Sequence, residues 1–104
     1  MYIECKAGGL SGPARIGRVR FSKSRRTLYY GDQQLRRLPA GGYKANHYDV
    51  ATGVEYWVSG PKRDGRDRLY GERVPVHVDE DVRPEYWSQI RGLPHRAHEA
   101  DASR

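Results

Sequence analysis

Apolar and polar residues alternate along several short stretches of this chain, as they do in half-buried β-strands. The alternation is clearest over residues 54–59, where Val54, Tyr56 and Val58 share one face and Trp57 lies on the other. Tyr56 is therefore expected in the core, and Trp57 on an outer face that the C-terminal part of the chain covers. Other stretches with strand character are residues 2–6, 15–21, 26–30, 43–50 and 74–78.

Turn residues separate these stretches. The sequence Ala51-Thr52-Gly53 predicts a tight hairpin between residues 43–50 and 54–59. Residues 33–38 fit either a short strand or a single helical turn. Strands at this spacing, about 8–12 residues apart, are typical of a small sandwich or barrel.

Two positions interrupt the regular alternation. In the stretch 15–21, a bulge near Gly17 would bring Ile16, Val19 and Phe21 to the core side. Pro75 cannot donate a hydrogen bond to a neighbouring strand, so its stretch is expected at the edge of the sheet.

The apolar period lengthens near the C-terminal end of the sequence. Apolar residues there recur at every fourth position and form an apolar stripe, which consists of Val82, Tyr86 and Ile90. They predict a helix near residues 82–91, with Trp87 beside the stripe. Asp81 is a suitable N-cap and Gly92 a suitable terminator.

Residues 1–92 are thus expected to form a single small, mainly β domain. It would be a bent sheet or an SH3-like or OB-like barrel of five to seven short strands with one C-terminal helix. Residues 93–104 lack an apolar period and are expected to be a disordered tail. Removing this tail is expected to leave the domain intact.

Composition narrows the class of protein. The chain has 104 residues, of which 37% are hydrophobic, and a single cysteine, Cys5. One cysteine excludes an internal disulfide and any zinc site with several cysteines. No apolar run is long enough to span a membrane, and no signal segment opens the sequence. These features favour a cytoplasmic protein with no membrane partner.

Charge is distributed unevenly between the two halves. Residues 1–46 contain ten Lys and Arg against two acids, a net charge of +8, whereas residues 47–104 contain nine against eleven, a net charge of −2. Cations and aromatic rings on adjacent strands are how small barrels bind single-stranded nucleic acid. The residues expected to form such a face, within the segment 15–37, are Arg18, Arg20, Arg26, Tyr30, Arg36 and Arg37.

A second candidate is the glycine-containing loop 60–71, which could hold a phosphate or carboxylate group. Its cations are Lys62, Arg63, Arg66 and Arg68. The loop does not match a Walker motif, and a solvated loop whose acids pair with neighbouring arginines is the favoured interpretation over a ligand site. Leu69 and Tyr70 are expected to anchor it to the core.

Residues for covalent or metal chemistry are few. Nothing in the spacing brings His47 or His77 beside Cys5, so no catalytic residue is predicted. His95 and His98 lack a third metal ligand. No metal and no cofactor are therefore expected, although an enzyme that holds a phosphorylated substrate in the loop 60–71 remains an alternative.

The sequence resembles a small uncharacterised family of bacterial proteins of about this length. The stretches that carry the resemblance are residues 1–6, 12–18, 21–23, 27–30, 55–61, 67–71, 78–82 and 85–87. Members of that family are sometimes labelled 1-deoxy-D-xylulose-5-phosphate synthase. That enzyme is a large thiamine diphosphate protein, and this sequence has no Gly-Asp-Gly…Asn-Asn diphosphate-binding pattern. The resemblance therefore implies no catalytic residue and no cofactor here.

These observations predict a non-enzymatic basic module that binds an anionic partner, with single-stranded nucleic acid as the leading candidate. The alternative is a protein-interaction module that docks an acidic partner or associates with itself through its basic and acidic halves. The oligomeric state does not follow from the sequence.

Overall fold

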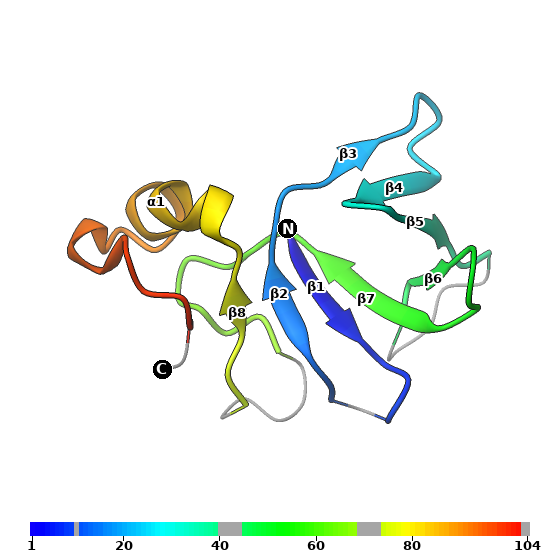
Figure 1. Ribbon diagram of the computed structural model, residues 1–104, viewed down its shortest axis with the longest axis horizontal. Coiled ribbons are helices and arrows are strands. Elements are labelled where there is room, and N and C mark those ends of the chain that lie inside the picture. Colours follow the sequence, from blue (N-terminus) through cyan, green and yellow to red (C-terminus); the bar gives the residue numbers. More distant parts are fainter. Residues whose placement is uncertain (10, 40–44, 69–73, 103–104) are drawn as a thin grey trace.

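The computed structural model describes residues 1–9, 11–39, 45–68 and 74–102. Within them, eight strands form one sheet in the order β3-β4-β5-β6-β7-β1-β2-β8 (Figure 1). The strands are β1 (Tyr2–Cys5), β2 (Ala14–Ile16), β3 (Arg20–Phe21), β4 (Thr27–Tyr30), β5 (Gln33–Arg37), β6 (His47–Asp49), β7 (Glu55–Ser59) and β8 (His77–Val78). The predicted mainly β class with one C-terminal helix is confirmed, and residues 33–37 form a strand.

A short connection forces this sheet to curl. Only residues 17–19 join β2 to β3, yet β3 lies six places from β2 in the sheet. Six strand spacings in a flat sheet amount to about 29 Å, whereas a three-residue link spans about 14 Å at most. The strands therefore bend round into a half-barrel, whose open side this link crosses (Figure 1).

Gly17 marks the bend. A Cβ atom at this position would lie 2.5 Å from the Tyr30 ring and 2.6 Å from the Asp79 carboxylate, so the close approach of these side chains requires glycine.

The predicted bulge near Gly17 is instead a break between β2 and β3. The prediction that it brings three apolar residues to one core is wrong. Ile16 and Val19 pack in different cores, and Phe21 is 43% exposed.

The two cores lie on opposite faces of β1. Inside the half-barrel, Ile3 packs with Leu28, Leu35 and Val58. On the other face, Tyr2 packs with residues of β2, β8 and the helix, so the helix covers the outside of the sheet. Trp57 packs against this second core, as the alternation predicts.

The predicted helix is present as a continuous helical segment. It comprises η1 (Glu80–Val82, a 3-10 turn), α1 (Arg83–Glu85) and η2 (Tyr86–Ile90, a π-helical stretch). Its N-cap is Asp79 rather than Asp81, and the Asp79 side chain makes no capping bond. The segment ends at Gly92, whose positive φ of 65° suits glycine.

Residues 93–102 are folded, so the prediction of a disordered tail is wrong for them. They include η3 (Pro94–Arg96), and the chain then runs antiparallel to β8: Val78 N donates to Ala100 O at 2.6 Å, and Ala102 N donates to Val76 O at 2.8 Å. Ala102 is buried in the helix-side core. Backbone hydrogen bonds and small side chains hold this segment, and neither leaves an apolar period in the sequence.

Deleting residues 94–104 should therefore destabilise the domain. The truncation removes the acceptor of the Trp87 indole N–H, which is Glu99 O at 3.0 Å, and the bonds to β8. A buried donor without a partner costs about 1–3 kcal/mol, and each kcal/mol lowers Tm by about 4–8 °C in a domain of this size. We expect a fall in Tm on the order of 10 °C in a thermal melt.

The control for this truncation is Glu99→Ala in the full chain. It removes the Arg96–Glu99 ion pair of 2.9 Å but keeps the Glu99 carbonyl, so Tm should change little. Equal melting of the truncated and full chains would show that the tail adds nothing to stability.

Candidate nucleic-acid interface

The pairing of the strands shows which residues of the predicted basic face project outward from the half-barrel. Arg20 pairs with Tyr29, and Thr27 pairs with Arg36. Paired residues of adjacent strands share a face, so these residues project outward, opposite Leu28 and Leu35 in the barrel core. Arg20 also stacks on Tyr29, with its guanidinium carbon 4.9 Å from the ring centroid.

Three of the predicted arginines surround one groove at the ends of β4 and β5. The groove has a volume of about 640 Å³. We call it the arginine groove. Its described lining residues are Ser24, Arg26, Thr27, Arg36, Arg37, Leu38 and Pro39. Arg26 and Arg37 are neighbours across the two strands, since Arg37 N donates to Arg26 O at 2.8 Å.

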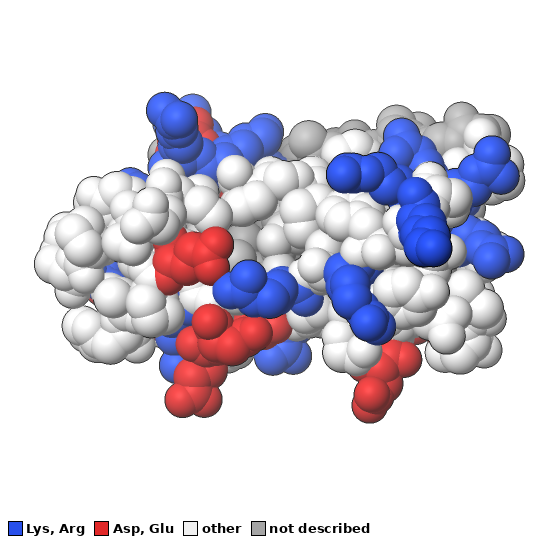
Figure 2. All heavy atoms as spheres, turned by 90° about the horizontal axis from the view of Figure 1, so that it is seen from above, with Lys and Arg blue, Asp and Glu red and all other residues white. Residues whose placement is uncertain are grey.

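The arginines of this groove are exposed and uncompensated. Within the described parts of the chain, the side chains of Arg26, Arg36 and Arg37 form no hydrogen bond and no ion pair. On the face shown in Figure 2, Lys and Arg side chains spread over the half of the molecule that holds β3, β4 and β5. The largest group of acids lies near the helical half. Positive potential is thus concentrated at this end of the sheet.

Arg18 and Tyr30 do not join the groove. Arg18 Nη2 lies 2.8 Å from Glu85 Oε2 in an exposed ion pair. The Tyr30 hydroxyl donates a short hydrogen bond to Asp79, and burial together with this bond raises the pKa of Tyr30. Asp79 also accepts from Arg15 Nε at 2.8 Å, so it ties β2 and β4 to the start of the helix.

Sequence reasoning missed Tyr48, which lies next to this groove. Tyr48 pairs with Arg36 across β5 and β6, and therefore projects from the same outer face. A separate hollow of about 500 Å³ lies beside it. The described residues that line this Tyr48 hollow are Lys6, Ala7, Leu38, Tyr48, Thr52, Gly53, Val54 and Glu55. The sequence offers no signal for this, because alternation with the polar residues His47 and Asp49 would place Tyr48 in the core, whereas it is His47 and Asp49 that are buried.

The loop after residue 60 does not present its cations together. Arg68 is buried and donates to the carbonyl oxygens of Gly12 at 2.8 Å, Val74 at 2.9 Å and Pro75 at 3.1 Å. Its guanidinium therefore holds the protein together and is not available to a ligand. Leu69 and Tyr70 lie outside the described residues.

Asp67 occupies the interior of the same loop. Its Oδ1 accepts from the backbone N–H of Lys62 at 2.7 Å, and burial raises the pKa of the Asp67 carboxyl. Arg66 lies 4.0 Å from Asp64, while Arg63 is exposed. Backbone donors that could cradle a phosphate are thus partly taken by the chain's own carboxylate.

A buried charged cluster lies on β1, where alternation predicts exposed side chains. Glu4 accepts from the Tyr2 hydroxyl at 2.5 Å, from Lys6 Nζ at 2.9 Å and from the Gly12 N–H at 3.1 Å. Arg68 Nη1 lies 3.4 Å from the same carboxylate. This cluster joins β1 to both neighbouring loops.

The residues considered for catalysis remain apart. Cys5 pairs with Tyr56 across β1 and β7, and Tyr56 pairs with His47 across β6, so a strand separates Cys5 from His47. Burial, together with the nearby charge of Arg37, lowers the pKa of His47. His77 lies on β8, beside Arg15.

The residues with described positions contain no group of three or more His, Cys, Asp or Glu side chains that could hold a metal ion. None of the helices described is long and apolar enough to cross a membrane.

Comparisons of this chain with protein-family models, with curated proteins and with solved structures found no match.

Proposed function

We propose that this chain is a small non-enzymatic module that binds single-stranded nucleic acid, with the arginine groove contacting the phosphates. The observation that carries the proposal is the convergence of Arg26, Arg36 and Arg37 on one groove without an acidic partner among the described residues. Planar guanidinium groups match the geometry of phosphate oxygens and bind them through paired hydrogen bonds.

The electrostatic repulsion among these three arginines supports the binding of an anionic ligand. Like charges on adjacent strands repel, and an anion in the groove relieves that repulsion. Some arginines elsewhere in the fold have carboxylate partners, namely Arg15 with Asp79, Arg18 with Glu85 and Arg96 with Glu99. The absence of such partners, within the described part of the chain, at three neighbouring arginines supports the arginine groove as a site for an external anion.

Replacing Arg26, Arg36 and Arg37 together by glutamine should weaken binding of a labelled single-stranded oligonucleotide. Each lost phosphate contact reduces the salt slope by about 0.7 on a single strand, so three contacts reduce it by about 2. Fluorescence anisotropy over a series of salt concentrations measures both the affinity and the slope. Because the three side chains are exposed, Tm of the variant should equal or exceed that of the parent.

The matched control replaces Lys62, Arg63 and Arg66 by glutamine, which changes the net charge equally. These residues are exposed in the loop after residue 60, so this control should bind nearly as the parent does. Equal loss in both triple variants would mean that net charge alone drives binding. A parent that binds no DNA or RNA at low salt would refute the proposed function.

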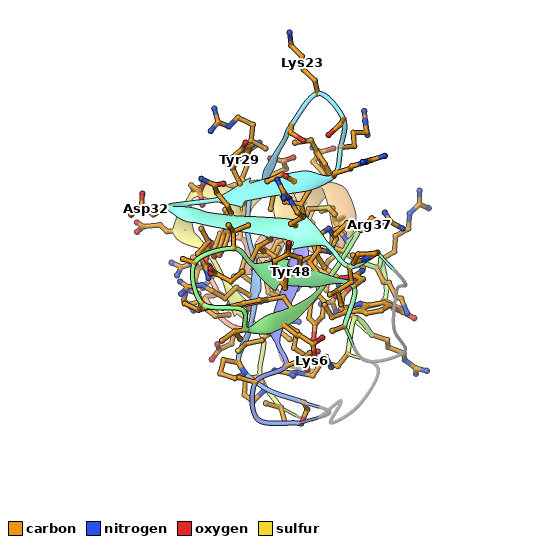
Figure 3. The ribbon with its side chains drawn as sticks, turned by 90° about the vertical axis from the view of Figure 1, so that its right-hand side faces the viewer. Lys6, Lys23, Tyr29, Asp32, Arg37 and Tyr48 are labelled. Carbon is orange, nitrogen blue, oxygen red and sulfur yellow. The ribbon has the colours of Figure 1, made fainter. Side chains whose placement is uncertain are left out.

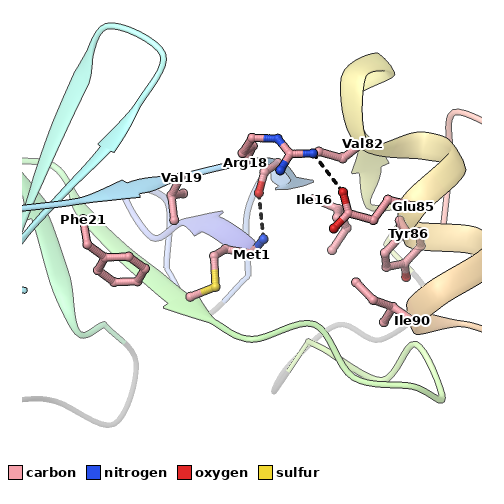
Figure 4. Close-up of a pocket in the computed structure, with 10 residues that line it drawn as sticks. Met1, Ile16, Arg18, Val19, Phe21, Val82, Glu85, Tyr86 and Ile90 are labelled. Carbon is pink, nitrogen blue, oxygen red and sulfur yellow. Dashed lines mark hydrogen bonds and ion pairs between the residues drawn. The ribbon is translucent and has the colours of Figure 1, made fainter.

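A second candidate function is the docking of a protein partner. An apolar cleft of about 270 Å³ separates β3 from the helix, with Val19, Phe21 and Ile90 on its walls (Figure 4). Phe21 is 43% exposed there, and the Arg18–Glu85 ion pair lies at the cleft. Self-association through this cleft would appear as a concentration-dependent mass in light scattering, abolished by Phe21→Ser.

A further inference from the structure

We propose that the Tyr48 hollow is a nucleobase subsite that continues the arginine groove, with a base stacked on the Tyr48 ring. This inference rests on the proposed function, since it assigns a second part of the same binding surface. A strand bound there places phosphates against the arginines and one unstacked base against Tyr48.

The two depressions adjoin each other at one residue. Leu38 lines both the arginine groove and the Tyr48 hollow. Arg36, which lines the groove, is the direct cross-strand neighbour of Tyr48, so its guanidinium and the tyrosine ring project from the same face. Figure 3 looks onto this end of the molecule, with Tyr48 and Arg37 both labelled on the strands that face the viewer.

Of Tyr29 and Tyr48, the tyrosines that the described strands place on this face, Tyr48 is the one whose ring has no partner. Among the residues with described positions, Tyr48 has no hydrogen bond and no ring contact through its side chain. Tyr29, on the same outer face, is instead covered by Arg20 at 4.9 Å. An aromatic ring that borders a hollow and lacks a partner is suited to stacking on a base, which every nucleotide offers.

Lys6, the cation in the lining of the hollow, is buried and paired with Glu4 at 2.9 Å, so the carboxylate of Glu55 decides that the hollow favours a base over a phosphate. Glu55 pairs with Tyr48 across β6 and β7 and lines the hollow. Its carboxylate repels phosphate but accepts hydrogen bonds, as base amino groups require. Phosphates therefore lie on the arginine side of Leu38, and the base on the Tyr48 side.

Duplex nucleic acid does not satisfy this arrangement, because its base faces are covered by neighbouring bases. A base can reach a tyrosine ring only when it is splayed out of the stack, as in single strands. We therefore expect the protein to prefer a single strand over a duplex of the same sequence and length.

The test compares Tyr48→Leu with Tyr29→Leu in anisotropy titrations against a single-stranded oligonucleotide. Loss of one stacked base should weaken binding of Tyr48→Leu roughly 5- to 150-fold, without changing the salt slope. Tyr48→Phe keeps the ring and should bind as the parent does. Tyr29→Leu, whose ring is covered by Arg20, should have a much smaller effect.

An oligonucleotide with abasic sites provides the second arm. The parent should bind it as weakly as Tyr48→Leu binds the normal oligonucleotide, and Tyr48→Leu should lose nothing further on it. If Tyr48→Leu binds the normal oligonucleotide as the parent does, while the arginine variant still flattens the salt slope, the base subsite is refuted and the proposed function stands. Failure of the parent to bind any oligonucleotide refutes both. Melting curves of the Tyr48 variants establish that each is folded.

Discussion

Replacing Trp87 by alanine should destabilise the protein by about 3–5 kcal/mol, which is most of the stability of a domain of this size. Trp87 is fully buried in the helix-side core and packs edge-to-face on Tyr86, with ring centroids 5.0 Å apart. Its indole N–H donates to Glu99 O at 3.0 Å, and the Arg96 guanidinium carbon lies 4.2 Å from its ring centroid. The substitution therefore leaves a cavity and separates the helix from the C-terminal segment.

Urea denaturation followed by circular dichroism measures this loss, since the variant lacks one of the two tryptophans on which fluorescence depends. Phe21→Ala is the matched control, because it truncates an aromatic residue that is 43% exposed and should change the midpoint little. If Trp87→Ala and the parent share a midpoint, the helix does not depend on Trp87 for docking.

Replacing Glu4 by glutamine should have the second large effect, also about 3–5 kcal/mol. The carboxylate is fully buried and faces two buried cations, Lys6 at 2.9 Å and Arg68 at 3.4 Å. Glutamine preserves the volume but removes the negative charge, so both cations lose the same buried counter-charge. The Gly12 and Tyr2 hydrogen bonds to this side chain are weakened as well.

Glu85→Gln is the control that makes this measurement specific. It neutralises a carboxylate in an ion pair of 2.8 Å with Arg18, but both side chains are more than half exposed, at 60% and 56%. Solvent screening limits such a pair to at most about 1 kcal/mol. Equal unfolding free energies for Glu4→Gln and Glu85→Gln would contradict a structural role for the buried cluster.

Trp87 and Glu4 both lie on the side of β1 that faces away from the barrel interior. Trp87 and Tyr2 build the core beneath the helix, and Glu4 continues the same face toward Arg68. The arginine groove lies at the other end of the sheet, on β4 and β5. Stability and the arginine groove thus depend on different residues, so the arginine variants can be studied in a folded protein, whereas Lys6 belongs both to the buried cluster and to the lining of the Tyr48 hollow.

Local sequence determined the elements of this fold. Alternation over residues 54–59 predicted the faces of Tyr56 and Trp57, because a strand has a period of two whatever surrounds it. The turn at residues 51–53 and the four-residue spacing of Val82 and Tyr86 are equally local, so the hairpin and the helix were predictable.

Sequence also indicated where positive charge would gather, but not which arginines share a surface. That depends on the register of β4 with β5 and on contacts across the fold. Arg18 forms an ion pair with Glu85 on the helix, and the Tyr30 hydroxyl donates a hydrogen bond to Asp79, so neither side chain lines the groove. Tyr48 enters the surface through its pairing with Arg36, a relation between residues twelve positions apart.

Only the tertiary structure decided which faces are buried. The half-barrel buries Ile3, and the helix together with the loops buries Tyr2 and Glu4, so β1 is enclosed on both sides although its sequence alternates. The same enclosure explains the ordered C-terminal segment, whose Ala102 is held by a backbone hydrogen bond to Val76, just before β8. The hydrophobic period and the turn residues depend only on a few neighbouring positions of the chain. Burial depends instead on the curl of the sheet, which the three-residue link between β2 and β3 imposes.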